Sequence, residues 1–153
     1  MLQVTHSQNS AFDATFKADH FAPASSPADV RELAAKLVAS DRLQDAVELI
    51  QTAFQEYPDS EDLLVTHILL SEIQNHWSEA AKALEKLVTL QGTQTTLETW
   101  RHWVRVLRCE GDHYRAHQVT LRALKHHARD PLLLSELSAL ESILGPQVRK
   151  IAA

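Results

Sequence analysis

Apolar residues recur at three- and four-residue spacing along most of the chain, which is the pattern of amphipathic α-helices. From residue 27 onward these stripes come in pairs, and a short polar break within each pair contains Asp41, Asn75 or Gly111. These residue types tolerate a left-handed backbone, so each break predicts a tight turn between two helices. A last apolar stripe over 131–144 stops at Gly145 and a proline, which is a strong helix-stop signal.

The helix pairs repeat with a nearly constant period. Ser26 suits an N-cap and the proline after it suits the first helical position, because its missing N–H has no intrahelical partner there. Helices are predicted to start 34, 36 and 34 residues apart, at Pro27, Glu61, Leu97 and Pro131. A small residue in the second helix of each pair keeps the same period: Ala46, Ala80 and Ala116. The sequence therefore predicts three copies of one helix–turn–helix unit and a final helix.

This period and these alanines resemble the tetratricopeptide repeat (TPR) family. The family's other small position, in the first helix, holds Ala34 but also the larger Ile68 and Val104. The resemblance implies an all-α fold, a right-handed α-solenoid of three TPR-like helix–turn–helix pairs plus a C-terminal capping helix. The resemblance implies an N-terminal extension over 1–26, a TPR-like domain over 27–144 and a tail over 145–153. Within the domain, the repeats cover about 27–60, 61–96 and 97–130, and the capping helix covers 131–144.

Composition and charge narrow the class of protein. With 153 residues but only three glycines and five prolines, the chain is about one domain long and poor in turn residues. Residues 27–98 hold five basic and thirteen acidic side chains, whereas residues 99–130 hold seven basic and three acidic ones. The net charge of the chain is −5, but the charge is distributed unevenly along it. An acidic average disfavours nucleic acid and anionic membrane as partners. With no apolar run long enough for a membrane span, no secretory signal pattern and one cysteine, we expect a soluble cytoplasmic protein.

In TPR proteins the first helices of successive repeats line a concave groove that binds peptides or helices. Carrying the family's six groove positions onto each of the three repeats gives eighteen residues. Nine of them are taken as candidate binding residues: Arg31, Val65, Thr66, Leu69, Glu72, Arg101, His102, Arg105 and Arg108. The implied groove is apolar in the middle and basic at one end. The resemblance therefore implies a non-catalytic protein–protein interaction module, that is, an adaptor, assembly factor or chaperone whose partner is a protein or peptide.

Three of the candidates form an arginine row. Arg101, Arg105 and Arg108 lie at i, i+4 and i+7, hence on one helix face. Guanidinium groups bind carboxylates well, so this row favours an acidic partner. The alternative interpretation is a solvated arginine face. The subfamily that grips chaperone C-termini is not predicted, because Ala35 and Glu98 replace an asparagine and a lysine that it needs.

Three of the four phenylalanines lie in the N-terminal extension: Phe12, Phe16 and Phe21. The sequence predicts a short helix over 10–20 with the first two rings on one face. Because a short isolated helix is marginal in water, we expect these rings to dock in the chain's own groove, in a second copy or on a partner. The alternative is a loose tail with incidental aromatics.

No metal, cofactor or catalytic site is predicted. His113 and His117 share a helix face, but two ligands do not make a metal site, and packing roles are favoured. Cys109 is expected to be a structural or surface thiol. The sequence contains no nucleophile elbow, phosphate loop or dinucleotide turn, so we do not expect an enzyme.

Two other functions stay open. One is a homo-oligomeric structural protein assembled through the N-terminal segment or the terminal repeat, since the last helix carries more leucines than one face needs. The other is a chaperone like those of type III secretion translocators, suggested by size and layout alone. Nucleic-acid binding through the basic residues between 99 and 130 ranks last.

Overall fold

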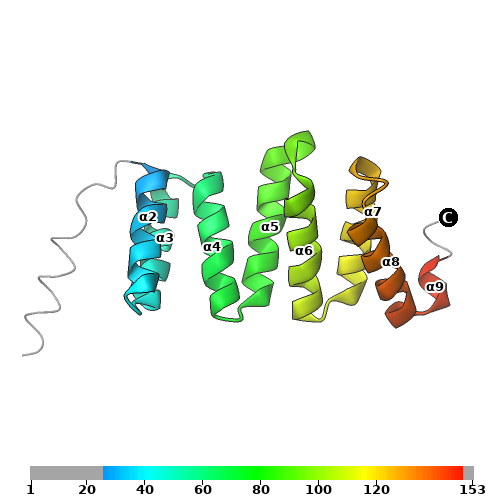
Figure 1. The fold of residues 1–153 in the computed structure, drawn as a ribbon. Helices are drawn as coiled ribbons and strands as arrows, with labels where there is room; N and C mark the ends of the chain where they lie inside the picture. The colour runs from blue at the N-terminus through cyan, green and yellow to red at the C-terminus, as the bar shows by residue number, and fades with distance from the viewer. Residues whose placement is uncertain (1–25, 150–153) are drawn as a thin grey trace, which may run out of the picture.

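The computed structural model describes residues 26–149, and residues 1–25 and 150–153 lie outside this range. The described chain is all-α, without strands (Figure 1). Each helix packs against the next in sequence, and α2 also packs against α4. The elements are α2 (Pro27–Ala39), α3 (Leu43–Glu56), α4 (Glu61–Ile73), α5 (Trp77–Gln91), the 3₁₀ helix η1 (Gly92–Gln94), α6 (Leu97–Glu110), α7 (His113–His126), α8 (Pro131–Leu144) and α9 (Pro146–Arg149).

The predicted helix starts and turns are confirmed. The helices α2, α4, α6 and α8 begin at the expected residues, each after an N-cap whose side-chain oxygen accepts the backbone N–H three residues on: Ser26, Ser60, Thr96 and Asp130. Between paired helices the backbone is left-handed, with φ of 59° at Asp41, 58° at Asn75 and 86° at Gly111. Local sequence therefore determines where each helix pair begins and turns.

The small and apolar positions of the repeating pattern lie in the core. Ala46, Ala80 and Ala116 are completely buried, which allows the paired helices to approach closely. Ala34, Ile68 and Val104 are each only 1% exposed, so the core accommodates the two larger side chains. Equivalent positions thus have equivalent environments in consecutive helix pairs, which is compatible with a helical repeat.

The buried residues form two clusters. One cluster joins α2 and α3 to α4, and the larger one runs from α4 to α8. In the larger cluster the rings of Trp100 and Trp103 stack with centroids 6.0 Å apart. The Arg122 guanidinium lies 5.4 Å from each ring centroid, so a cation–π contact covers this part of the core.

Two elements were not expected. The range 145–153 was predicted as a tail, but Pro146–Arg149 forms α9, which packs on α8. The second repeat also contains η1 after α5, where the Thr95 hydroxyl donates a 2.7 Å hydrogen bond to the Gly92 carbonyl. Compared with the first pair, α5 is one residue longer than α3 and the linker that contains η1 is one residue longer, which lengthens the period from 34 to 36. Among the described residues no helix is long and apolar enough to cross a bilayer.

Candidate functional site

The first helices of the pairs form one layer of the molecule. In Figure 1, α2, α4, α6 and α8 lie in this layer, and α3, α5 and α7 lie behind it. Ion pairs link α2 to α4, α4 to α6 and α6 to α8. We call the exposed surface of α2, α4, α6 and α8 the first-helix face. All nine candidate binding residues lie on helices of this layer.

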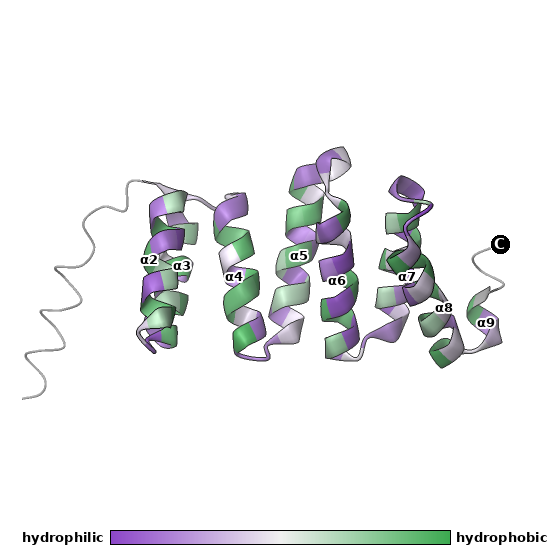
Figure 2. Cartoon of the chain, viewed as in Figure 1, coloured by the Kyte–Doolittle hydropathy of each residue, from purple (hydrophilic) through white to green (hydrophobic). Residues whose placement is uncertain are grey.

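The middle of the first-helix face carries a row of exposed aliphatic side chains. Val65, Leu69 and Ile73 are 42%, 50% and 53% exposed and lie at i, i+4 and i+8 on α4. We call them the α4 stripe. In Figure 2, α4 is predominantly hydrophobic, whereas hydrophilic segments follow one another along α6. Contiguous exposed apolar surface of this kind marks sites of contact with other chains.

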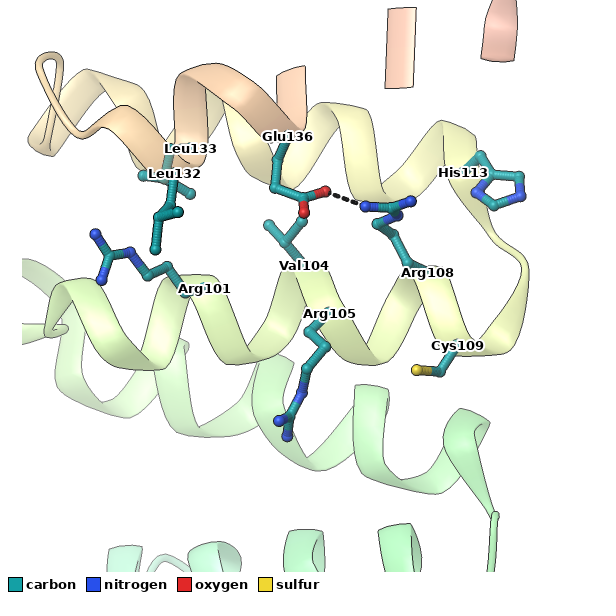
Figure 3. Close-up of a pocket in the computed structure, with 9 residues that line it drawn as sticks. All are labelled: Arg101, Val104, Arg105, Arg108, Cys109, His113, Leu132, Leu133 and Glu136. Atoms are coloured by element: carbon teal, nitrogen blue, oxygen red, sulfur yellow. Dashed lines mark hydrogen bonds and ion pairs between the residues drawn. The ribbon is translucent and has the colours of Figure 1, made fainter. Parts of the chain in front are cut away.

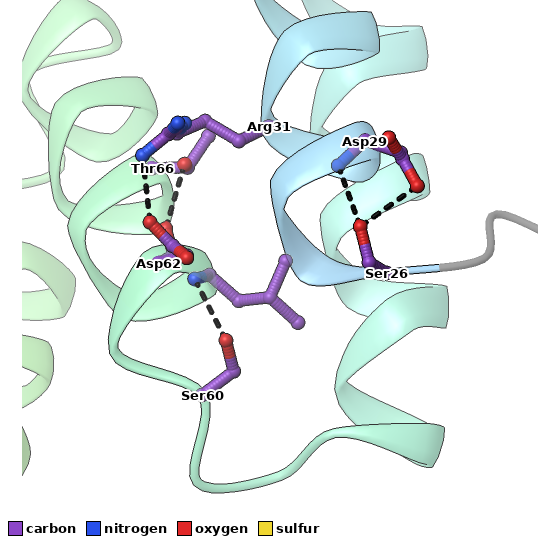
Figure 4. Close-up of polar contacts among 7 residues, drawn as sticks. Ser26, Asp29, Arg31, Ser60, Asp62 and Thr66 are labelled. Carbon is purple, nitrogen blue, oxygen red and sulfur yellow. Dashed lines mark hydrogen bonds and ion pairs between the residues drawn. The ribbon is translucent and has the colours of Figure 1, made fainter.

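Thr66 does not belong to this exposed surface. It is 8% exposed, and its hydroxyl donates a 2.8 Å hydrogen bond to the Asp62 carbonyl one turn earlier. In Figure 4, Thr66 lies beside Arg31, whose Nη1 donates a 2.7 Å hydrogen bond to the Asp62 carboxylate. Little of Thr66 is therefore accessible on the first-helix face, since α2 packs against α4.

The arginine row is present on α6, but the carboxylates that it binds come from the chain itself. Arg101 pairs with Asp130, which is the N-cap of α8. Arg108 Nη1 lies 2.6 Å from Glu136 Oε2 on α8. Both acidic residues are about one repeat away in sequence, so the arginines join adjacent first helices.

The third arginine shares its partner with a histidine. Glu72 on α4 accepts a 2.8 Å hydrogen bond from Arg105 Nη2, and the same oxygen lies 3.0 Å from His102 Nε2. The Glu72 side chain is 14% exposed, whereas that of Arg105 is 65% exposed. Glu72 is thus largely enclosed by α6, and Arg105 keeps most of its surface in solvent.

Two ionisable groups in or at the ends of the first helices have shifted pKa values. The hydrogen bond from Arg101 lowers the pKa of Asp130, and the backbone N–H of Leu133 lowers it further, against an opposing effect of burial. On α4, burial lowers the pKa of His67, partly opposed by the charge of Glu79. Asp130 therefore stays ionised as both a helix cap and a link between α6 and α8.

A pocket of about 490 Å³ lies between α6 and α8 (Figure 3). Its inner wall contains the buried Val104 and Leu133, and the Arg108–Glu136 pair spans it. Leu132, which is 56% exposed, stands at one side of the opening, and in Figure 3 Arg105 points away toward α4. The full lining is Arg101, Val104, Arg105, Arg108, Cys109, His113, Leu132, Leu133 and Glu136.

The pocket is also lined by residues of α8 that were not among the nine candidates. Leu132 and Glu136 belong to the terminal helix, for which the sequence predicted a capping role and an alternative role in self-assembly. They are its second and sixth residues, and both are groove positions in the TPR pattern. Extending that pattern by one helix would have found them. Ile73, which the family pattern also places at a groove position, completes the α4 stripe because it follows Leu69 by one turn.

The remaining expectations concern histidines, the cysteine and the N-terminal segment. His117 is buried, with its Nε2 3.8 Å from Glu141, and His113 borders the pocket. Within residues 26–149, no three His, Cys, Asp or Glu side chains come together as a metal site. Cys109 is exposed at the end of α6. Phe12, Phe16 and Phe21 lie outside the described residues. No protein-family model matches the chain, and no curated protein matches it in sequence.

Proposed function

We propose that the protein is a non-catalytic TPR-like interaction module, a right-handed solenoid of three helix pairs plus a capping helix, that binds an apolar segment of another protein. The α4 stripe is the observation that carries this proposal. Three large aliphatic side chains, each about half exposed, lie in one row in the middle of the first-helix face. Their spacing suits the i, i+4 anchors of an amphipathic helix laid along α4.

Apolar burial supplies most of the recognition in this proposal. Full burial of a Val, Leu or Ile side chain is worth about 1.5–3 kcal/mol, and about half of each stripe residue is already covered. The stripe alone therefore offers roughly 2–4 kcal/mol, which corresponds to a Kd of about 1 mM or weaker. Useful affinity requires a segment long enough to reach the pocket between α6 and α8 as well, where Leu132 adds further apolar surface.

An acidic partner is a narrower form of the same proposal. Arg101 and Arg108 are half-buried and already paired, so an external carboxylate has to compete with Asp130 or Glu136. Arg105 is the most exposed of the three. An acidic residue in the partner is therefore expected to contact Arg105 and to add specificity more than affinity.

A second candidate function is self-assembly through the terminal helix. Leu134 and Ile143 on α8 are 46% and 53% exposed, and this helix has no further helix pair beside it in the described chain. Such a surface supports a homo-oligomer. It is tested by light scattering of the Leu134→Glu variant, which should have the monomer mass if α8 forms the contact.

The main proposal is tested by selecting binders from a random peptide library displayed on phage, with the full chain as bait. The Leu69→Glu variant should bind the selected peptides at least about tenfold more weakly, because it buries a charge in place of an aliphatic contact. The matched control is Leu90→Glu on α5, which changes a residue that is 41% exposed in the other layer. Equal affinity of wild type and Leu69→Glu, or an equal loss in the control, contradicts the proposal.

A further inference from the structure

We infer that the α4 stripe is covered, in the free protein, by the chain's own N-terminal segment over residues 10–21, so that this segment competes with any partner. The inference rests on the proposed function of the first-helix face and names a ligand for it. The segment contributes Phe12, Phe16 and Phe21, and the stripe contributes Val65, Leu69 and Ile73.

The first argument is the distribution of aromatic residues. The fourth phenylalanine, Phe54, is half-buried and packs against both core clusters, with its ring 5.9 Å from that of His67. The other three lie within ten consecutive residues that precede the helical domain. Each ring presents about 150–250 Å² of surface, which makes three exposed rings in so short a segment costly in water. An apolar surface on the same chain is the contact available at the highest effective concentration.

The second argument is spacing. Phe12 and Phe16 lie at i and i+4, as do Val65 and Leu69. In a helix this spacing corresponds to a rise of about 6 Å in both rows. A short helix over 10–20 can therefore place one ring against each step of the α4 stripe, in the manner of a helix bound in a groove.

The third argument is reach. The segment joins α2 at Ser26, and both α2 and α4 begin at the same end of the molecule (Figures 1 and 4). The Arg31–Asp62 contact of 2.7 Å shows that the N-terminal halves of these two helices lie side by side. Five residues from Phe21 to Ser26 span up to about 17 Å when extended, whereas packed helices are about 8–10 Å apart.

The direction of the chain fits as well. A segment that runs back from Ser26 along α4 meets the stripe at Val65 first and at Ile73 last. It therefore presents Phe21, Phe16 and Phe12 in that order and runs antiparallel to α4, which is the favourable arrangement of helix dipoles. Of the other exposed large apolar residues, Leu90 and Tyr114 lie on second helices, and Leu132, Leu134 and Ile143 lie on α8 at the opposite end of the row of helices. The α4 stripe is thus the nearer exposed apolar row on the described surface.

The charges on the face allow an apolar ligand of this kind. Arg31, Glu72 and Arg105 beside the stripe already have partners within the domain. The only Asp, Glu, Lys or Arg side chains of the segment are Asp13, Lys17 and Asp19, so the segment neither requires nor disrupts these ion pairs. A partner must displace the segment. The apparent affinity of the partner is therefore reduced in proportion to the fraction of time that the segment covers the face.

The inference is tested on the full chain with a triple variant, Phe12→Ser, Phe16→Ser and Phe21→Ser. Methyl NMR should show that the resonances of Val65, Leu69 and Ile73 shift when the rings are removed, while those of Leu134 and Ile143 stay in place. A matched control replaces three polar residues inside the same segment, with Asp13→Ser, Thr15→Ser and Lys17→Ser, and should leave the stripe resonances largely unchanged. Unchanged stripe resonances in the phenylalanine variant overturn the inference.

Cys109 provides a second readout, because it is the only cysteine and is exposed on α6, one turn beyond Arg105. A nitroxide at this position lies toward the Ile73 end of the stripe, since Arg105 contacts Glu72. It should broaden the amide signals around Phe12 more than those around Phe21, at all protein concentrations. Broadening that disappears on dilution assigns the segment to a second copy and overturns the intramolecular assignment.

The same variants separate this inference from the proposed function. If the segment covers the stripe for about nine-tenths of the time, the triple phenylalanine variant binds a selected peptide about tenfold more tightly than wild type. Equal affinity of the two proteins, with Leu69→Glu still defective, overturns the inference and leaves the proposed function standing. Peptide binding that is insensitive to Leu69→Glu overturns the proposed function itself.

Discussion

The helices α4 and α6 hold equivalent places in successive helix pairs but have opposite surfaces. Residues 36 positions apart correspond in the two helices. Where α4 has Val65, Leu69 and Ile73, α6 has Arg101, Arg105 and Cys109. Their inward positions are alike, because Ile68 and Val104 are both 1% exposed. The fold depends on the shared inward positions, and the outward positions are free to differ.

The outward residues of the two helices also differ in what they contact. The three arginines of α6 are bound by carboxylates from α4 and α8, so they hold first helices together. The α4 stripe contacts no such partner in the described chain and stays half exposed. Within one layer, α6 therefore acts as the joint and α4 as the open surface, which is why we place binding on α4.

The largest effect that tests this comparison is expected from neighbouring residues of α4. Ile68→Ala should lower the free energy of unfolding by about 2–5 kcal/mol, because it leaves a cavity in the core. Leu69→Ala should change it by about 0.5 kcal/mol or less, because the side chain is half exposed. Urea denaturation of both variants measures the difference. Similar losses in the two variants would show that the stripe is part of the core.

A smaller effect should come from the joint between α6 and α8 at low pH. The Arg101 hydrogen bond holds the pKa of Asp130 below its ordinary value, so the unfolded chain takes up a proton first as the pH falls. The contribution of Asp130 to stability is therefore complete above a pH of about 5 and is lost as the pH falls through about 4 and below.

This pH dependence is measured by urea denaturation of wild type and Asp130→Asn from neutral to acidic pH. Asparagine keeps the helix-capping ability but does not titrate, so the variant's profile should be flatter in the acidic range. Arg101→Gln should flatten it in the same way, since it removes the cause of the shift. Profiles parallel to wild type in both variants would mean that this joint does not control acid stability.

The smallest effect is expected from the outward surface of α6. Arg105→Ala removes a pair whose arginine is 65% exposed, so unfolding should become easier by about 0.5 kcal/mol or less. Denaturation and peptide binding are measured together in this variant. A loss of peptide affinity larger than that of Leu69→Glu would reverse the comparison and place the main binding surface on α6.

Much of the architecture could be predicted because it depends on local signals. The N-cap residues, the buried alanines and the left-handed turn at Asn75 act within a few residues of themselves, so the sequence alone is enough to locate them. The α4 stripe was predictable for the same reason, since Val65 and Leu69 share a helix face.

The polar contacts between helices could not be predicted. That Arg105 meets Glu72, and that Arg108 meets Glu136, depends on how far one helix is shifted along the next. The burial of Thr66 was unpredictable for a similar reason, because the angle between α2 and α4 decides which side of α4 is covered. Side-chain spacing within one helix contains no information about either quantity.

The neighbour-to-neighbour packing of the helices also has a consequence for how the chain folds and yields to force. Helices contact the next element in sequence, and the one stronger exception, α2 with α4, skips a single helix. Such low contact order favours rapid folding, since little loop-closure entropy has to be overcome. It also means that loosening one end leaves distant helices intact, so a pulling force or a processive protease is expected to remove the structure helix by helix.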